Sequence, residues 1–338
     1  MKLAYFEAQD GDEAKLKKAL AGVEVAAVAG QLDEKTAEAA ADAEMVSVFV
    51  QSELPKKILD KLPSLQMIAT RSTGYDHVDM KECARRGIVV SNVPTYGENT
   101  VAEHAFALIL ALSRKIFQSF ERTEKMDFDR EGLEGFDLSG KTLGVIGCGN
   151  IGRHSVMIGR GFGMKVLVSD VHPDEEFARQ TGCRFVDSLD ELLEQSDVIT
   201  VHVPFIPGKT NHLVNKDNVK KIKRGAVLVN TARGGIVDTA ALLWALEEGI
   251  LAGAGLDVLE EEDDTFDHVA LLSRGFSRGQ DIVTLLRNHL LVERDDVIIT
   301  PHNAFNSREA RQRIFATTIE NIAAFVKGKA VNIVTTNG

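Results

Sequence analysis

The sequence predicts an α/β protein built from two doubly wound parallel-sheet domains. Three observations predict it. Short β-rich runs alternate with helical stretches along the chain, the alternation restarts at Thr142, and a glycine-rich turn stands at that restart. Alternating strands and helices are typical of βαβ units, whose strands are parallel. A chain of 338 residues also has room for two domains of roughly 150 residues each.

Each half of the chain has its own set of strands. Before residue 100 the β-rich runs are KLAYFE, VEVAAVAG, MVSVFV, LQMIAT and GIVVSNV, separated by helical stretches such as DEAKLKKALAG and DEKTAEAAADAE. From Thr142 onward they are LGVIGCG, MKVLVSD, RFVD, DVITVHV, AVLVNTA, AGAGLDVL and DVIITPH. Each half therefore predicts a mostly parallel sheet.

Two helices border the second half. TVAEHAFALILALSRKIF is apolar on most sides and predicts a buried helix, and the spacing of Thr100 and Glu103 predicts a capping box at its start. The amphipathic stretch NSREARQRIFATTIENIAAFVKGK follows the last strand. This C-terminal helix either closes the second domain or returns to the first.

Composition excludes several classes of function. The formal charge is −11 and the pI about 5.4, whereas nucleic acids and anionic membranes bind clustered basic faces. The N-terminal stretch MKLAYFEAQDGDEAK has no signal-peptide pattern, and the apolar run AFALILAL is far shorter than the roughly 20 residues that cross a bilayer. Cys83, Cys148 and Cys183 form no CxxC pair, and no ligand set has metal spacing. We therefore expect a cytoplasmic protein that binds neither nucleic acid, membrane nor metal.

The turn TLGVIGCGNIGR has the pattern of a dinucleotide-binding loop. Gly147, Gly149 and Gly152 follow an apolar strand and precede a helical stretch. Glycine lets the backbone turn tightly and approach a pyrophosphate, whose charge the helix N-terminus stabilises. The next strand ends in Asp170, an acid that accepts hydrogen bonds from the adenosine ribose and repels a 2′-phosphate. The segment DVHPDEE contains no Arg or Lys, so the sequence predicts NAD rather than NADP.

Charged side chains follow three later strands. Arg233 ends AVLVNTAR, Asp257 stands in AGLDVLEEE with Glu262 five residues on, and His302 ends DVIITPH. Ligands bind at the carboxyl ends of parallel strands, so these groups are expected beside the nicotinamide. Arginine suits a planar carboxylate and histidine exchanges a proton near neutral pH, which favours a substrate with a carboxylate beside a carbonyl. His202 ends a strand in the same way, so spacing alone leaves two candidate histidines.

Longer motifs spread over most of the chain resemble one family. They are STGYDHVDM, NVPTYGENTVAEHA, GVIGCGNIG, VNTARGGIVD, GLDVLEEE and TPHNAF, and together they are similar to the D-isomer-specific 2-hydroxyacid dehydrogenases. The resemblance implies a flavodoxin-like substrate domain of residues 1–99 and 306–338. A Rossmann NAD-binding domain, residues 100–305, is then inserted within it, and the active site is expected in the cleft between the two domains.

The resemblance also assigns roles to individual residues. Arg233 is implied to bind the substrate carboxylate and polarise the carbonyl, His302 to be the acid/base, and Glu262 to orient His302. Further substrate contacts are implied for the backbone amides of Thr73 and Gly74, for Tyr96 and for Phe305. The resemblance implies NAD contacts by Val101, Gly147, Gly149, Asn150, Ile151, Gly152, Asp170, His202, Val203, Pro204, Thr231, Ala232, Arg233, Asp257 and His302. It further implies a homodimer formed through the Rossmann domain.

The position of the orienting glutamate departs from the family pattern. Glu262 is followed by Asp263, where many relatives have proline, and the segment from Glu262 to His302 is longer than in much of the family. Glu260 and Glu261 stand directly before it. The family register favours Glu262, and the residues alone leave all three open.

The sequence thus predicts an NAD-dependent oxidoreductase that interconverts a small 2-ketoacid and its D-2-hydroxyacid. NVPTYGENTVAEHA and PHNAF are closest to the D-lactate dehydrogenase branch, which implies pyruvate and D-lactate. One alternative is a larger or phosphorylated D-2-hydroxyacid, for which Arg71 supplies one cation. The other is a non-catalytic NAD(H)-sensing scaffold, since the C-terminal-binding corepressors resemble the same family.

Overall fold

The computed structural model describes residues 1–261 and 282–335. The chain divides into two compact units: unit 1 is Met1–Tyr96 with Ser307–Gly338, and unit 2 is Gly97–Asn306. Each unit contains one sheet, and every strand pair in both sheets is parallel. The predicted α/β class with two doubly wound parallel sheets is therefore confirmed.

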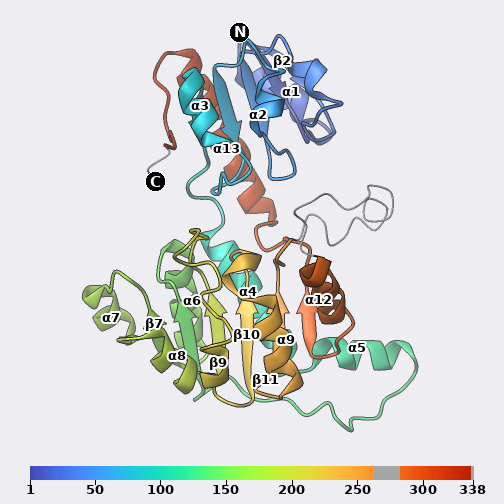
Figure 1. Ribbon diagram of the computed structural model, residues 1–338, viewed down its shortest axis with the longest axis vertical. Helices are drawn as coiled ribbons and strands as arrows, with labels where there is room; N and C mark the ends of the chain where they lie inside the picture. The colour runs from blue at the N-terminus through green and yellow to red at the C-terminus, as the bar shows by residue number, and fades with distance from the viewer. Residues whose placement is uncertain (262–281, 336–338) are drawn as a thin grey trace. The chain divides into compact units, whose positions relative to one another are not determined.

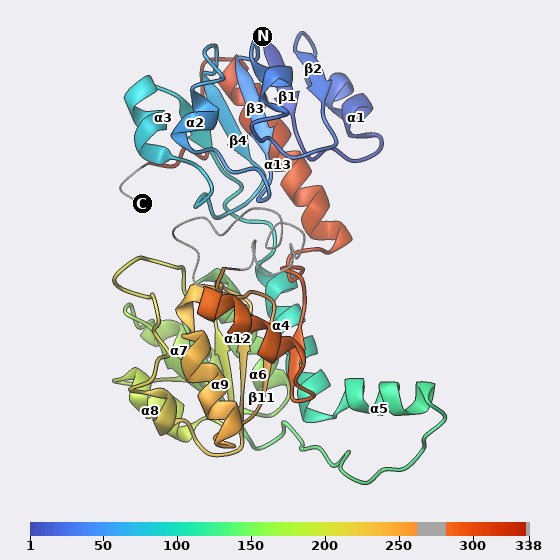
Figure 2. The ribbon, with the colours of Figure 1, turned by 45° about the vertical axis from the view of Figure 1, so that its right-hand side comes forward.

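Unit 1 has a five-stranded sheet in the order β2-β1-β3-β4-β5, which is the flavodoxin-like order. Its strands are β1 (Lys2–Tyr5), β2 (Glu24–Ala27), β3 (Met45–Val48), β4 (Met67–Thr70) and β5 (Val89–Ser91). Its helices are α1 (Asp12–Ala19), η1 (Ala37–Ala40), α2 (Lys56–Leu59), α3 (Met80–Arg86) and α13 (Arg308–Val326). Figure 2 labels most of these elements and shows the C-terminal helix α13 beside strands from the start of the chain.

Strand alternation distributes the core of unit 1 over two faces. Leu3 and Tyr5 pack with residues of α1 and α13, whereas Ala4 and Phe6 pack with residues of η1, α2 and α3. The C-terminal helix therefore belongs to unit 1, which settles the alternative that its sequence leaves open.

The helix predicted from DEKTAEAAADAE is reduced to the single 3₁₀ turn η1. The Asp33 carboxylate accepts hydrogen bonds from the amides of Lys35 and Thr36, and the Thr36 hydroxyl donates to the Gln31 carbonyl. Side chains that bind nearby backbone groups compete with helix formation, so this segment forms a turn.

Unit 2 has a seven-stranded sheet in the order β12-β11-β10-β9-β6-β7-β8. Its strands are β6 (Thr142–Ile146), β7 (Lys165–Ser169), β8 (Arg184–Phe185), β9 (Val198–Val201), β10 (Ala226–Asn230), β11 (Leu251–Leu256) and β12 (Val297–Ile299). Counted within the unit, this is the Rossmann strand order with one added edge strand. The order reverses between β6 and β9, beside the glycine-rich turn. Figure 1 labels β7 on one side of this point and β9, β10 and β11 on the other.

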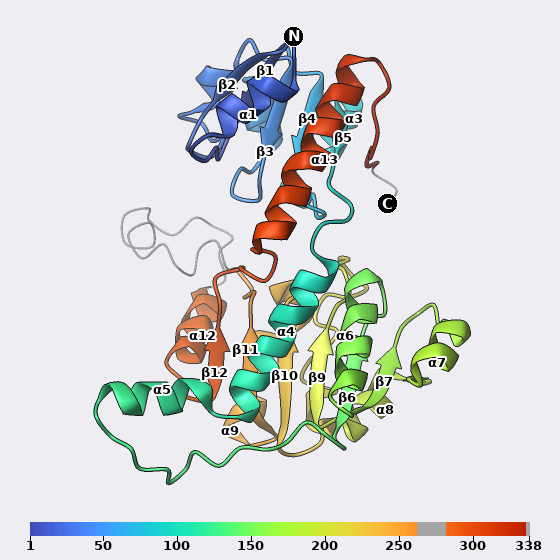
Figure 3. The ribbon, with the colours of Figure 1, turned by 180° about the vertical axis from the view of Figure 1, so that it is seen from behind.

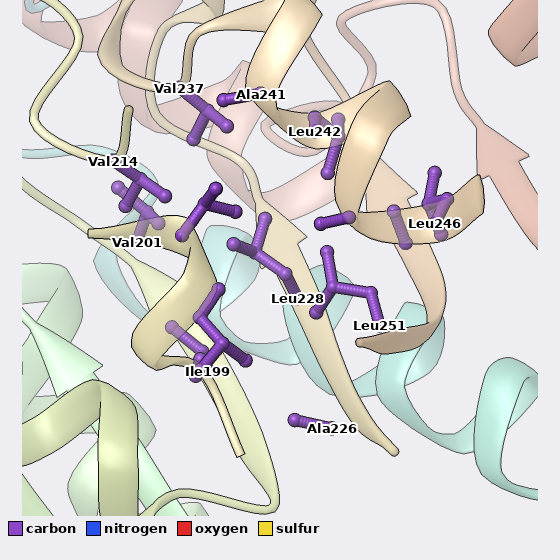
Figure 4. Packing of buried hydrophobic residues seen from close by; sticks show 14 of the residues in the cluster. Ile199, Val201, Val214, Ala226, Leu228, Val237, Ala241, Leu242, Leu246 and Leu251 are labelled. Atoms are coloured by element: carbon purple, nitrogen blue, oxygen red, sulfur yellow. The ribbon is translucent and has the colours of Figure 1, made fainter. Parts of the chain in front are cut away.

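Helices cover both faces of this sheet. They are α4 (Glu98–Ser113), α5 (Ile116–Glu124), α6 (Asn150–Gly161), α7 (Glu175–Thr181), α8 (Leu189–Gln195), α9 (Thr239–Glu247) and α12 (Ile282–Val292), with short turns η2 (Val219–Lys221) and η3 (Gly234–Ile236). Residues of α4 and α6 pack with one face, seen in Figure 3. Residues of α8, α9 and α12 pack with the other, and Figure 4 shows Leu228 of the sheet between Ile199 and Leu242 of α9.

The start of α4 differs from the predicted capping box. The helix begins at Glu98, after Gly97, so Thr100 lies inside its first turn and is buried. The Glu103 carboxylate accepts a hydrogen bond from the Asn99 side chain. The helix ends at Ser113, because Lys115 adopts a left-handed conformation with φ 52° before α5 begins. In the part of the chain that the structure describes, neither helix nor any other has the length and apolarity of a membrane span.

Candidate active site

The glycine-rich turn of unit 2 has the shape that a dinucleotide requires. Gly147 has φ 91°, and a Cβ atom there would lie 2.7 Å from the Val203 side chain. A Cβ atom at Gly152 would lie 2.0 Å from the Gly147 carbonyl oxygen, so this glycine lets α6 pack on the turn. At Gly149 a Cβ atom would meet nothing within 4 Å. Gly149 is thus the open position, where the backbone can approach a pyrophosphate at the start of α6.

Asp170 connects the end of β7 to this turn. One carboxylate oxygen accepts a hydrogen bond from the Cys148 amide at 2.6 Å, and the other accepts one from the His172 amide at 2.8 Å. Asp170, the predicted ligand of the adenosine ribose, therefore lies against the glycine-rich turn, as in a dinucleotide site.

His202 is held inside unit 2 as a neutral side chain. Its Nε2 atom lies 2.9 Å from the Ser155 hydroxyl of α6 and 2.9 Å from the Thr200 hydroxyl of β9. Burial lowers the pKa of His202 to about 3. A histidine that stays neutral through the physiological range is poorly suited to act as a general acid, so His202 is the weaker of the two candidate histidines.

The turn after β10 is braced by Asn230. The buried Asn230 side chain accepts a hydrogen bond from the Ala232 amide at 3.0 Å and donates one to the Arg233 carbonyl at 2.9 Å. The half-buried Arg233 side chain donates to the Ala232 carbonyl at 2.8 Å. Thr231, also implied as a cofactor contact, is buried here. Sequence reasoning missed Asn230, because a buried strand-end asparagine has no distinctive spacing.

His302 sits on a turn that Asp257 organises from the neighbouring strand. Its amide donates to the Asp257 carbonyl at 2.9 Å. The Asp257 carboxylate, 1% exposed, accepts hydrogen bonds from the amides of Asn303 and Ala304, both at 2.8 Å, and from the Thr300 hydroxyl. His302 has φ 49°, a left-handed conformation that is uncommon and costs free energy in a residue other than glycine, and such residues cluster at functional sites.

A second histidine, His104 of α4, completes this arrangement. Its Nε2 atom lies 3.0 Å from the Thr300 hydroxyl and 3.5 Å from an Asp257 carboxylate oxygen. Burial raises the pKa of Asp257, but hydrogen bonds from His104, Thr300 and the two amides outweigh it, so the net shift is downward. Asp257 therefore stays ionised and holds the turn. Sequence reasoning missed His104, although the motif NVPTYGENTVAEHA contains it.

The first two glutamates of the run, Glu260 and Glu261, have different surroundings. Glu260 binds His212 through one oxygen at 2.6 Å, and its other oxygen accepts the Thr239 amide at 2.9 Å and hydroxyl at 2.5 Å. Glu260 thus holds the start of α9. Glu261 is exposed and has φ 52°. Glu262, the predicted partner of His302, lies outside the described residues.

The predicted substrate contacts of unit 1 lie on a tightly bonded turn after β4. The Thr73 hydroxyl donates to the Val93 carbonyl at 2.9 Å, and the Asn92 side chain donates to the Thr73 carbonyl at 2.8 Å. The Ser72 hydroxyl donates to the Gly74 carbonyl at 2.6 Å. Within residues 1–261 and 282–335, the backbone amides of Thr73 and Gly74 donate no hydrogen bond. Tyr96 is half-buried, and its carbonyl accepts the Arg313 guanidinium at 2.6 Å.

The remaining predicted contacts lie at the same carboxyl edge of the sheet in unit 2. Asn150 and Ile151 begin α6, and Val101 lies in the first turns of α4. Val203 and Pro204 follow β9, and Phe305 follows the His302 turn and is half-buried. Unit 2 thus gathers the glycine-rich turn, Asp170, Arg233 and His302 at the ends of its strands. Among the described residues, no group of three or more His, Cys, Asp or Glu side chains could hold a metal.

Comparison with known proteins identifies the family. The NAD-binding domain of the D-isomer-specific 2-hydroxyacid dehydrogenases matches residues 106–304. The D-lactate dehydrogenase of Escherichia coli is 34% identical over 97% of this chain and 98% of its own. The D-3-phosphoglycerate dehydrogenase of Methanocaldococcus jannaschii is 33% identical over 96% of this chain and 57% of its own.

A solved structure extends the likeness to three dimensions. The D-lactate dehydrogenase of Aquifex aeolicus, determined with NAD and lactic acid, has a TM-score of 0.84 and 37% identity, covering 97% of this chain and 96% of its own. The glycine-rich turn of the present chain has the geometry that NAD binding requires, as its sequence predicts. With this fold and these relatives, the chain belongs to the D-isomer-specific 2-hydroxyacid dehydrogenases, which are NAD-dependent oxidoreductases.

Proposed function

We propose that this enzyme interconverts a small 2-ketoacid and its D-2-hydroxyacid, and that pyruvate and D-lactate are the pair. The observation that carries the chemistry is His302 on a strained turn fixed by Asp257. This turn follows β12, and only β11 lies between β12 and β10, the strand that precedes Arg233. The choice of pyruvate is supported by the similarity to D-lactate dehydrogenases, one of them determined with lactic acid.

In this proposal the cofactor lies along the carboxyl edge of the unit 2 sheet. Its pyrophosphate is bound at Gly149 by the backbone of Asn150 and Ile151, and its ribose by Asp170. The other proposed contacts are Val101, Gly147, Gly152, His202, Val203, Pro204, Thr231, Ala232, Arg233, Asp257 and His302. Bound NADH supplies the hydride, and the residues of the chain supply everything else.

The chain then has two tasks, holding the carboxylate and supplying a proton. Arg233 binds the substrate carboxylate through two parallel hydrogen bonds and polarises the carbonyl. His302 donates its proton to the carbonyl oxygen as negative charge develops there, and it takes the proton back in the reverse reaction. Glu262 is proposed to orient His302. Thr73, Gly74 and Tyr96 are proposed as further carboxylate ligands, and Phe305 is proposed to lie beside the methyl group.

The surroundings of Arg71 disfavour a phosphorylated substrate. This arginine is 5% exposed and donates to the Phe6 carbonyl at 2.7 Å and the Ser47 hydroxyl at 3.2 Å. Its guanidinium also lies over the Tyr5 ring, 4.1 Å from the centroid. The cation considered for a phosphate is thus directed into the interior of unit 1.

A steady-state screen tests the proposed function. Pyruvate, 2-ketoisocaproate and phosphohydroxypyruvate are each assayed with NADH and with NADPH. We expect the highest kcat/KM for pyruvate with NADH. A higher value for the branched or the phosphorylated ketoacid would replace the proposed substrate. NADH binding without turnover of any of the three would favour the scaffold alternative.

His104 is expected to act as a positioning residue for the His302 turn. His104→Ala removes the contacts to Thr300 and Asp257 and should lower kcat about tenfold, the effect of losing one hydrogen bond to a charged group. His104→Gln places a polar atom at a similar reach and should restore most of that loss. The readout is kcat, with the Kd of NADH measured by its fluorescence, which should change less than twofold. Equal kcat in the wild type and the alanine variant would contradict this role.

We also propose that the enzyme is a homodimer formed through unit 2. Helix α5 buries none of its residues, and large apolar side chains on it and on the following loop are exposed: Ile116, Phe117, Phe120, Met126 and Phe128. Monomers rarely expose an apolar patch of this kind, and a self-complementary pair is the commonest way to cover one. Figure 3 shows α5 extending away from the strands of its own sheet.

Sedimentation velocity tests the dimer. The wild type should sediment as a dimer at micromolar concentration, and the double variant Phe117→Glu with Phe120→Glu should sediment as a monomer. Glu121 of α5 is exposed and charged, and the Glu121→Gln variant is the control, which should remain dimeric. A monomeric wild type would refute the proposal.

The state of the cysteines supports a cytoplasmic location, which we include in the proposal. Cys83, Cys148 and Cys183 are all buried and none forms a disulfide. Free thiols are typical of proteins kept in a reducing compartment.

A further inference from the structure

The fold brings an arginine to the end of β7, where the neighbouring sequence has no basic residue. Arg153 lies in the first turn of α6, directly after Gly152. Its guanidinium donates to the Asp174 carboxylate at 2.5 Å and lies over the Phe177 ring, 4.5 Å from the centroid. Asp174 itself caps α7 by accepting the Phe177 amide at 3.0 Å. The helix of the glycine-rich turn thus reaches the loop that follows Asp170.

Arg153 and the two aspartates form one electrostatic cluster. The hydrogen bond to Asp174 raises the pKa of Arg153 against the opposing effect of burial, and the charge of Asp170 adds to the rise. The Phe177 amide and then Arg153 lower the pKa of Asp174. Arg153 and Asp174 are therefore both charged at neutral pH, and they form an ion pair beside Asp170.

Proteins that bind NADP place an arginine beside the adenosine ribose, where it pairs with the 2′-phosphate. In this chain Arg153 interacts electrostatically with Asp170, the proposed ribose ligand, and is already paired with Asp174. We infer that Asp174 is a determinant of cofactor specificity that acts by holding Arg153 away from a 2′-phosphate, while Asp170 repels that phosphate directly. The inference rests on the proposed ribose site at Asp170.

The pair is suited to being released by a single substitution. The Arg153 and Asp174 side chains are 40% and 35% exposed, and ion pairs with this exposure contribute little to stability. An arginine bound to a phosphate makes stronger, charge-assisted hydrogen bonds. Loss of the Asp174 charge should therefore make Arg153 available without unfolding unit 2.

The test uses Asp174→Asn, because asparagine caps a helix about as well as aspartate but carries no charge. Binding of NADPH, NADH and the fragment 2′,5′-ADP is measured by calorimetry and nucleotide fluorescence, without turnover. Asp170→Ala alone should lower the Kd of NADPH. Adding Asp174→Asn should lower the Kd of NADPH and of 2′,5′-ADP by a further factor of about ten, as one new charge-assisted contact predicts.

Two further variants separate a released arginine from a general change of charge. Arg153→Ala, added to the double variant, should remove the gain from Asp174→Asn. Glu175→Gln, added to Asp170→Ala, removes the same charge one residue away and should give less than a twofold gain. The melting temperature of each variant confirms that it is folded.

The binding measurements test the role of Asp174 and the ribose site at Asp170 separately. If Asp174→Asn gives no more than Glu175→Gln, or if Arg153→Ala leaves the gain intact, the inference is overturned while the ribose site stands. If Asp170→Ala leaves NADPH binding unchanged, the ribose site is wrong and the inference falls with it. Neither result touches the proposed ketoacid chemistry, which the substrate screen tests separately.

Discussion

Replacing His302 with alanine should lower kcat for ketoacid reduction by on the order of 100-fold or more, the usual contribution of a positioned general acid. As the hydride reaches the carbonyl carbon, negative charge develops on the oxygen, and without His302 no side chain of the proposed site delivers a proton there. The cofactor should still bind, because the glycine-rich turn and Asp170 are unchanged. The measurement is kcat, together with the Kd of NADH.

The direction of the pH dependence follows from the proton that His302 carries. Reduction needs the protonated ring, so its rate should decline as the pH rises. Oxidation of the hydroxyacid needs the neutral ring, so its rate should decline as the pH falls. Loss of both dependences in His302→Ala would assign them to this residue.

His202 provides the internal comparison. Burial lowers the pKa of His202 to about 3, so its charge is constant across the assay range. His202→Asn should therefore keep both pH dependences, whatever it costs in stability. If the dependence disappears in the His202 variant and persists in His302→Ala, the acid/base has been assigned to the wrong histidine.

Arg233→Lys should lower kcat/KM by on the order of 100-fold or more. Lysine keeps the charge, but it cannot form two parallel hydrogen bonds to a carboxylate, and hydrogen bonds to charged groups contribute about 1.5–3 kcal/mol each. Because the same contact holds the substrate and polarises its carbonyl, KM should rise and kcat should fall together.

Arg224→Lys is a matched control for this effect. Arg224 precedes β10 as Arg233 follows it, and its guanidinium donates to the carbonyls of Glu248 and Gly249. This substitution at the opposite end of the strand should leave kcat/KM within about twofold of the wild type. Unchanged kinetics in Arg233→Lys would mean that Arg233 supplies only a general positive charge.

Local patterns in the sequence predict the fold class and the family well. The strand runs and the spacing of Gly147, Gly149 and Gly152 are short-range features, and the sheets and the glycine-rich turn form where they predict. The capping box at Thr100 is wrong because Gly97 starts the helix earlier, and the helix near residue 37 is wrong because Asp33 and Thr36 bind the backbone first.

Contacts between distant residues account for what the sequence does not predict. His104 lies 196 residues from Thr300 in the chain, and Arg153 lies 21 residues from Asp174. Neither pair has a spacing that marks it, because packing of α4 and α6 on the sheet brings its members together. The acid expected beside the nicotinamide at position 257 also has a second task, since its oxygens organise the His302 turn. The roles of the site residues remain predictions.

The left-handed conformation of His302 lowers the thermal stability of the protein at a position proposed to serve catalysis. A non-glycine residue in that conformation costs of order 1–3 kcal/mol, a noticeable share of the 5–15 kcal/mol by which domains are stable. Glycine would adopt the same turn without this cost. Selection for thermal stability alone would therefore favour glycine at this position over the proposed proton donor, whereas selection for turnover would retain the histidine. Engineering of this enzyme for higher temperature should leave this turn alone and add stability elsewhere.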